Sequence, residues 1–143
     1  MRLNKFISST GLYSRRKADE LIKDKRVSVN GETGIIGQDV NENDKVYVDG
    51  KPLEINENSV YIILNKPKGI TCTTERHIEG NIIDFVNHTE RIFPVGRLDK
   101  DSEGLIILTN DGDIVNKILR EGNDKKKEYI VTVNKSITSN FIR

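Results

Sequence analysis

The segment 96–104 reads GRLDKDSEG, and three carboxylates, Asp99, Asp101 and Glu103, alternate in it with other residues. On an extended chain alternate side chains share one face, so these carboxylates could act as a general acid and base or hold a cation. A solvated acidic loop would give the same pattern. From these residues alone that plainer interpretation is favoured, because nothing in the sequence shows which carboxylate is buried.

A calcium-binding loop of the EF-hand type begins with a similar alternation of oxygen ligands. Its twelfth position requires a bidentate glutamate, and counted from Asp99 that position is Asn110. The residues before it, 105–108, have the pattern of a buried strand, so the calcium interpretation fails. His77 and His88 have no cysteine or clustered carboxylate at ligand spacing, and no metal site is expected.

Charge is unevenly distributed, although the net charge of the 143 residues is only +1. Residues 1–26 contain eight basic side chains and three acidic ones, whereas residues 27–62 contain seven acidic and two basic ones. An RNA-facing patch on a small module would have this distribution. Its candidate contacts are Arg2, Lys5, Arg15, Arg16 and Lys17. On charge alone, an ordinary solvated basic helix is the favoured alternative.

Two short helices and two hairpins are predicted to hold these basic residues. Apolar residues at helical spacing begin at Leu3 and stop at Gly11, and Ser14 is a good N-cap for a second helix. The phrase V-x-V-[ND]-G occurs at 27–31 and again at 46–50, and it indicates strands that end in tight turns. The first 55 residues are therefore expected to form one small α+β module.

A second domain, 60–143, is expected after Pro52 and the polar stretch 54–59. It is predicted to contain buried strands at 60–64 and 105–108 and a further strand at 129–133. Helices are predicted at 81–87, after Asp113 as N-cap, and from Thr138 onward. One helical turn contributes little stability without packing partners, so the domain is expected to stop before its fold is complete.

Four segments resemble the ribosomal RNA pseudouridine synthase family and follow that family's order. GRLDKDSEGLIILTNDG at 96–112 is similar to its active-site segment, and LNKPKGI at 64–70 to its first motif. KEYIVTV at 127–133 is similar to its tyrosine-bearing strand. RLNKFIS at 2–8 with SRRKADELIKDKRVSVNG at 14–31 resembles the alpha-L RNA-binding motif. The segment 83–88, together with Phe93 and Pro94, is most similar to the large-subunit branch called RluF.

The resemblance implies roles for individual residues. Asp99 would be the nucleophile, Arg97 would take part in displacing the target base, and Tyr129 would pack against the flipped uracil. Lys66 and Pro67 would support the active-site loop. The fold implied is α+β, an alpha-L module followed by the N-terminal part of a mixed-sheet catalytic domain. The isomerisation gains no atom and changes no redox state, so no cofactor is expected.

The expected partner is ribosomal RNA, with large-subunit RNA favoured and a tRNA as a further possibility. Cys72 is the only cysteine, and no apolar run reaches the ~18 residues of a membrane span. These features and the absence of a signal-peptide pattern favour the cytoplasm. The oligomeric state is not predicted. The alternative function is RNA binding without catalytic activity, because members of the family continue well beyond the segment matched here.

Overall fold

The helices α1 (Leu3–Ser9) and α2 (Arg15–Lys23) open the chain, as the sequence predicts. The computed structural model describes residues 1–56, 58–119 and 128–142. The Ser14 hydroxyl accepts a hydrogen bond from the backbone N–H of Lys17 at 3.1 Å, which confirms the predicted cap. The apolar faces of the two helices meet in a core that includes Leu3, Phe6, Ile7, Ala18, Leu21 and Ile22.

The first sheet has four antiparallel strands in the order β2-β1-β3-β4. They are β1 (Val27–Val29), β2 (Glu32–Thr33), β3 (Val46–Val48) and β4 (Lys51–Pro52). Both predicted V-x-V-[ND]-G hairpins are confirmed, and Asn30 and Asp49 adopt positive φ angles of 53° and 51° at the turns. The outer valines of β1 and β3 are buried against the two helices.

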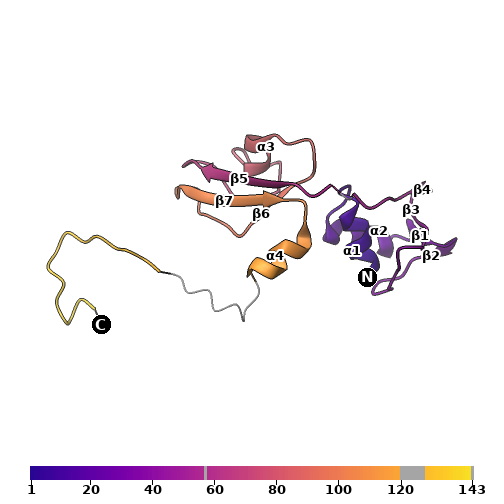
Figure 1. The fold of residues 1–143 in the computed structure, drawn as a ribbon, viewed down its shortest axis with the longest axis horizontal. Helices are drawn as coiled ribbons and strands as arrows, with labels where there is room; N and C mark the ends of the chain where they lie inside the picture. The colour runs from indigo at the N-terminus through magenta and orange to yellow at the C-terminus, as the bar shows by residue number, and fades with distance from the viewer. Residues whose placement is uncertain (57, 120–127, 143) are drawn as a thin grey trace.

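A second antiparallel sheet follows, in the order β5-β7-β6. Its strands are β5 (Tyr61–Lys66), β6 (Phe93–Val95) and β7 (Gly104–Thr109). The predicted helix at 81–87 is confirmed as α3 (Ile82–Val86), which Asn81 caps by accepting from the Asp84 N–H at 2.8 Å. This helix covers one face of the sheet, where Ile82 and Ile83 join Ile106 and Leu108 in a second core (Figure 1).

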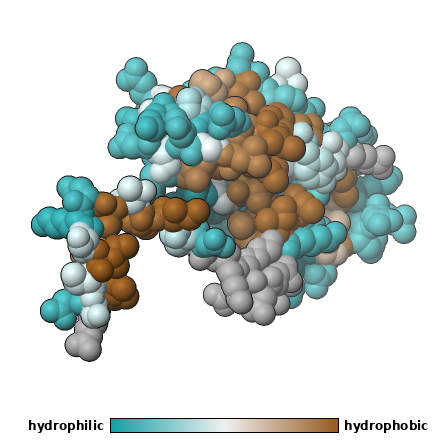
Figure 2. All heavy atoms as spheres, turned by 60° about the vertical axis from the view of Figure 1, so that its left-hand side comes forward, coloured by the Kyte–Doolittle hydropathy of each residue, from teal (hydrophilic) through white to brown (hydrophobic). Residues whose placement is uncertain are grey.

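The opposite face of this sheet is open. Tyr61, Ile63 and Leu105 are 53%, 71% and 70% exposed, so the predicted buried strands are buried on one side only. Figure 2 shows apolar atoms gathered on one face of the molecule. The expectation of fully buried strands was wrong. A short apolar run indicates a strand that packs on a core, but it does not show whether one or both faces of the sheet are covered.

The helix α4 (Gly112–Leu119) lies between the second sheet and α1 (Figure 1). Asp113 was expected to cap this helix, and that prediction was wrong. The Asp111 carboxylate caps it, accepting from the N–H groups of Asp113 at 2.8 Å and Ile114 at 3.3 Å. The helix begins at Gly112, one residue before Asp113, so the Asp113 carboxylate is free to bind Lys5 of α1.

Residues 128–142 contain no helix or strand and lie apart from both sheets (Figure 1). The strand predicted at 129–133 and the helix predicted from Thr138 are therefore wrong for the described part of the chain. At Thr138 there is only a turn, in which its carbonyl accepts from the Phe141 N–H at 2.9 Å. A strand needs a paired neighbour, and this segment has none among the described residues.

The expected α+β class is confirmed by the two helix-and-sheet bodies. The first core consists of residues between Leu3 and Leu53, and the second of residues between Val60 and Leu108. The domain limits 1–55 and 60–143 stay a prediction. No helix in the described ranges has both the length and the apolar character needed to cross a lipid bilayer.

Candidate functional site

The loop that carries Asp99 joins β6 to β7 at one end of the second sheet. Glycines occupy both ends of the loop: Gly96 has φ +80° and Gly104 has φ +142°. A side chain at either position would be strained in this backbone conformation. The glycines of the GRLDKDSEG segment therefore set the path by which the loop leaves and rejoins the sheet.

Leu98 anchors this loop in the second core. Its side chain packs against the core cluster, and its backbone N–H points to the Cys72 sulfur at 3.5 Å, a weak contact. The residues on either side, Arg97 and Asp99, are exposed. The anchored leucine thus presents the predicted nucleophile and the predicted base-displacing arginine to solvent together, two residues apart.

Lys66, at the end of β5, is hydrogen-bonded to the loop that carries Asp99. Its side chain is fully buried, with 0% exposure. Its Nζ donates to the carbonyls of Pro67 at 2.9 Å, Ile70 at 2.9 Å and Lys100 at 3.3 Å. Lys100 follows Asp99 directly, so the ammonium ties the Asp99 loop to the segment 67–70. This geometry agrees with the supporting role expected of Lys66 and Pro67.

The same two segments are joined by a backbone hydrogen bond from Gly69 N–H to the Lys100 carbonyl at 2.8 Å. A turn follows, in which Ser102 N–H donates to the Asp99 carbonyl at 3.1 Å. The backbone that follows the Asp99 side chain is therefore fixed by hydrogen bonds. A fixed backbone limits the positions that the Asp99 carboxylate can reach and so lowers the cost of orienting it toward a substrate.

The Asp99 carboxylate makes no hydrogen bond or ion pair with any residue that the structure describes. Asp101 and Glu103 are also exposed. The arrangement offers a solvent-accessible carboxylate beside an accessible guanidinium, which suits nucleophilic attack or proton transfer on a bound molecule. Across residues 1–56, 58–119 and 128–142, no three His, Cys, Asp or Glu side chains could hold a metal ion together.

The structure does not bring Tyr129 to this loop. Its side chain is 77% exposed in the segment 128–142, which lies away from the second sheet (Figure 1). Of the motif 127–133, residue 127 lies outside the described residues. The contact between Tyr129 and a flipped base therefore stays a prediction.

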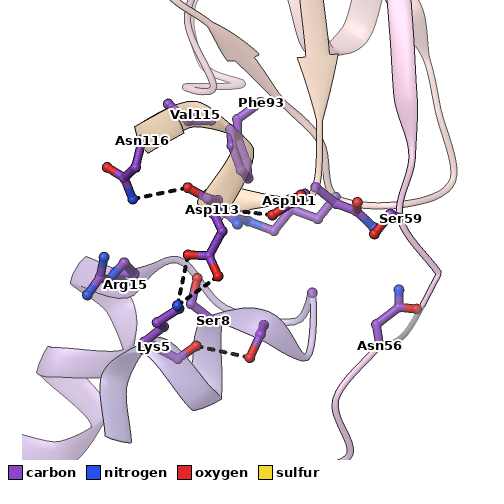
Figure 3. Close-up of a pocket in the computed structure, with 15 residues that line it drawn as sticks. Lys5, Ser8, Arg15, Asn56, Ser59, Phe93, Asp111, Asp113, Val115 and Asn116 are labelled. Atoms are coloured by element: carbon purple, nitrogen blue, oxygen red, sulfur yellow. Dashed lines mark hydrogen bonds and ion pairs between the residues drawn. The ribbon is translucent and has the colours of Figure 1, made fainter. Parts of the chain in front are cut away.

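Three of the five predicted RNA contacts are engaged in ion pairs within the chain. Arg2 binds Asp39 at 3.2 Å and Lys17 binds Glu20 at 2.8 Å. Lys5 binds Asp113 at 2.8 Å, and Figure 3 shows this pair spanning from α1 to α4. The remaining two, Arg15 and Arg16, are exposed at the start of α2 and have no such partner in the described part of the chain.

A cavity of about 400 Å³ lies between the two bodies (Figure 3). Its lining includes Lys5 of α1, Arg15 of α2, Phe93 of β6 and Asp113 of α4. A neighbouring cavity of about 610 Å³ shares Gly11 and Arg91 with the first. The sequence does not point to Arg91, because a single basic residue before a strand forms no pattern. Its position beside both cavities depends on how the two bodies pack against each other.

Two family models match the chain. The model described as RNA pseudouridylate synthase matches residues 60–142, and the model described as S4 domain matches residues 1–33. The first match includes the Asp99 loop, Lys66 and Tyr129, and the second includes α1 and α2.

Curated relatives are similar over nearly the whole chain. The dual-specificity RNA pseudouridine synthase RluF of Escherichia coli K12 is 57% identical over 145 residues, covering 100% of this chain and 50% of that protein. Its counterpart in Salmonella typhi is 58% identical over 144 residues, covering 99% and 50%. The ribosomal large subunit pseudouridine synthase B of Bacillus subtilis is 39% identical over 135 residues, covering 92% and 55%. The chain thus spans about half the length of the curated relatives it matches.

Proposed function

The chain belongs to the RNA pseudouridylate synthase family, and from this we propose that it converts a uridine of ribosomal RNA to pseudouridine, with Asp99 as nucleophile. The family match covers the whole Asp99 loop. The loop itself carries the proposal: Lys66 and Leu98 fix its backbone, while the Asp99 carboxylate stays open to a substrate.

The reaction breaks the bond between uracil nitrogen and ribose, turns the base, and joins ring carbon 5 to the same ribose carbon. The proton of carbon 5 leaves and a ring nitrogen gains one, so atoms balance without an oxidant or a cofactor. In this scheme the ionised Asp99 carboxylate attacks the substrate or takes a proton from the sugar. The exposed position of the loop leaves room for a nucleotide.

The target base must leave its helical stack, which costs a few kcal/mol. Arg97 would stack in the space that the base leaves, since a guanidinium plane can replace a base in a stack. Its exposed position two residues before Asp99 supports this role. Tyr129 would hold the displaced uracil, and a stacked aromatic ring contributes about 1–3 kcal/mol per base. For that, the segment 128–142 has to move to the Asp99 loop.

The partner would be ribosomal RNA, with large-subunit RNA favoured and tRNA second, in the cytoplasm. The names of the similar proteins support this choice, since one is called a large subunit synthase and others are called dual-specificity RNA synthases. The match of residues 1–33, which include α1 and α2, to the S4 domain also supports an RNA partner. Arg15 and Arg16 would add phosphate contacts, which position an RNA without selecting its sequence.

A second candidate function is RNA binding without catalysis by this chain. One observation favours it: Tyr129 is exposed in a segment that lies away from the Asp99 loop. The two candidates differ in whether a bound uridine is converted.

Tritium release from RNA that carries uridine labelled at carbon 5 tests the choice. For the first function, the chain releases tritium, and Asp99→Asn abolishes release while RNA affinity stays within about twofold. The carboxamide keeps the size of the side chain and removes the nucleophilic charge. Asp101→Asn is the matched control, and it should release tritium at the rate of the parent chain.

Equal loss in Asp99→Asn and Asp101→Asn would contradict a specific nucleophilic role for Asp99. RNA binding with no release from the parent chain would leave the second function as the valid one. Loss of both release and binding would contradict both functions.

A further inference from the structure

Arg91 sits where the two cavities between the bodies meet, and it lines both. The next residue, Ile92, is 2% exposed and belongs to the second core, so the backbone at Arg91 is firmly placed. The Arg91 side chain is partly buried, yet it makes no hydrogen bond or ion pair with any described residue. Burial lowers the pKa of its guanidinium, because water is removed without a compensating carboxylate.

An arginine of this kind is unfavourable unless it binds something. The guanidinium carries five N–H donors and stays charged at physiological pH. A partly desolvated charge without a partner costs free energy that a bound anion would return. Arg15 lines the same 400 Å³ cavity from the other body, is exposed, and also has no partner among the described residues.

The carboxylates that line the two cavities already have donors. Asp113 binds Lys5, and Asp111 accepts from the Tyr61 hydroxyl at 2.8 Å as well as capping α4. In the second cavity, Glu90 accepts from the Asn56 amide at 2.8 Å. Each of these carboxylates therefore has a hydrogen-bond donor, and Asp113 has a cationic one, whereas the guanidiniums of Arg91 and Arg15 have no acceptor among the described residues.

The other cations around the cavities are also committed. Lys17 binds Glu20 at 2.8 Å, and Arg76 lies 3.8 Å from Asp84. The two uncompensated guanidiniums thus come from different bodies, Arg15 from α2 and Arg91 from the segment before β6, and they border one cavity.

We propose that the cleft between the two bodies binds the phosphate backbone of the substrate RNA, with Arg91 and Arg15 as its phosphate contacts. One guanidinium group can donate two parallel hydrogen bonds to the oxygens of a phosphate. The two cavities follow one another past Arg91 and Gly11, which suits an extended strand. The inference rests on the proposed function for the identity of the RNA, and it adds a binding surface that lies outside the Asp99 loop.

Fluorescence anisotropy with a labelled RNA stem-loop, measured over a series of salt concentrations, tests the cleft. Each phosphate contact contributes about 0.7–0.9 to the slope of log affinity against log salt. Arg91→Gln and Arg15→Gln should each reduce that slope by this amount, and the double variant by about twice as much. Lys51→Gln, which removes a charge from the exposed end of β4 and lines neither cavity, should leave the slope unchanged.

Thermal unfolding separates binding from a structural role. The Tm of Arg91→Gln should equal or exceed that of the parent, because the variant removes an uncompensated charge. A fall in Tm with an unchanged slope would show a structural arginine and overturn the proposal. A slope unchanged in both single variants would overturn it as well, and tritium release from the parent chain would then show whether the proposed function still stands.

A parent chain that binds no RNA also overturns the cleft proposal. If tritium release is absent as well, the proposed function fails with it. If the slopes fall as expected but no tritium is released, the cleft stands as an RNA-binding surface and only catalysis by this chain is contradicted.

Discussion

Lys66 is buried at the end of β5 because its ammonium replaces water around three carbonyls. Lys66→Met keeps the length of the side chain and removes all three hydrogen bonds. We expect the free energy of unfolding to fall by about 2–3 kcal/mol, since the carbonyls lose a charged donor and are only partly reached by water. Urea denaturation monitored by circular dichroism measures this loss.

Lys68→Met is the matched control two residues away. Lys68 is exposed and makes no hydrogen bond or ion pair within the described ranges, so its replacement should change stability by less than about 0.5 kcal/mol. Equal effects of the two substitutions would show that the buried ammonium does not hold the loops together.

The sequence predicts candidate site residues more readily than their surroundings. The roles of Asp99 and Arg97 come from the family resemblance of the GRLDKDSEG segment and stay predictions, and the structure exposes both side chains. Arg91 could not be found, because its importance comes from two bodies that dock at residues far apart in the chain. The ion pair that engages Lys5 has the same origin, since its partner Asp113 is 108 positions away.

At the level of single elements, the start of α4 offers a test of the cap. Asp111→Ala removes the acceptor for the N–H groups of Asp113 and Ile114 and should destabilise the helix by about 1 kcal/mol. Amide hydrogen exchange of the first turn of α4 should become faster. Tyr61 also loses its hydrogen-bond acceptor in this variant, so exchange in β5 should be followed separately.

Asp113→Ala distinguishes the observed cap from the one that the sequence predicts. It leaves the Asp111 cap in place and breaks the ion pair with Lys5, in which Lys5 is 38% and Asp113 57% exposed. Exposed pairs contribute about 0–1 kcal/mol, and the first turn of α4 should keep its slow exchange. Faster exchange in Asp113→Ala than in Asp111→Ala would contradict the assigned cap.

Elements defined by local chemistry follow from the sequence, whereas elements that need a distant partner do not. The two hairpins are specified by Asn30 and Asp49 with the glycines that follow them, since those residues tolerate positive φ. The Ser14 cap is equally local. The segment 129–133 has the composition of a strand but no neighbour to pair with in the described part, so its composition alone did not decide its structure.

At the level of the whole molecule, the two bodies are joined by polar contacts. Asn110 holds the connecting segment against the second body, donating to the Asn58 carbonyl at 2.8 Å and accepting from the Val60 N–H at 2.9 Å. Asn56 binds Glu90 at 2.8 Å, and Lys5 binds Asp113. Polar junctions of this kind allow relative motion of domains more readily than apolar ones. An RNA strand between the bodies would add ionic contacts to a junction in which Lys5 and Asp113 already form one.

The open face of the second sheet affects how the purified protein will behave toward hydrophobic dyes. Because Ile63 and Leu105 are about 70% exposed in the folded state, the native chain should enhance the fluorescence of the dye ANS, a signal commonly taken to indicate a molten globule. Replacing both residues by threonine should lower that fluorescence, while the near-ultraviolet circular dichroism stays native in both proteins. Fluorescence that persists in the double variant would show that the dye binds elsewhere. With the expected result, dye binding alone would be no measure of misfolding in this protein, and a screen that discards dye-positive preparations would discard the folded chain.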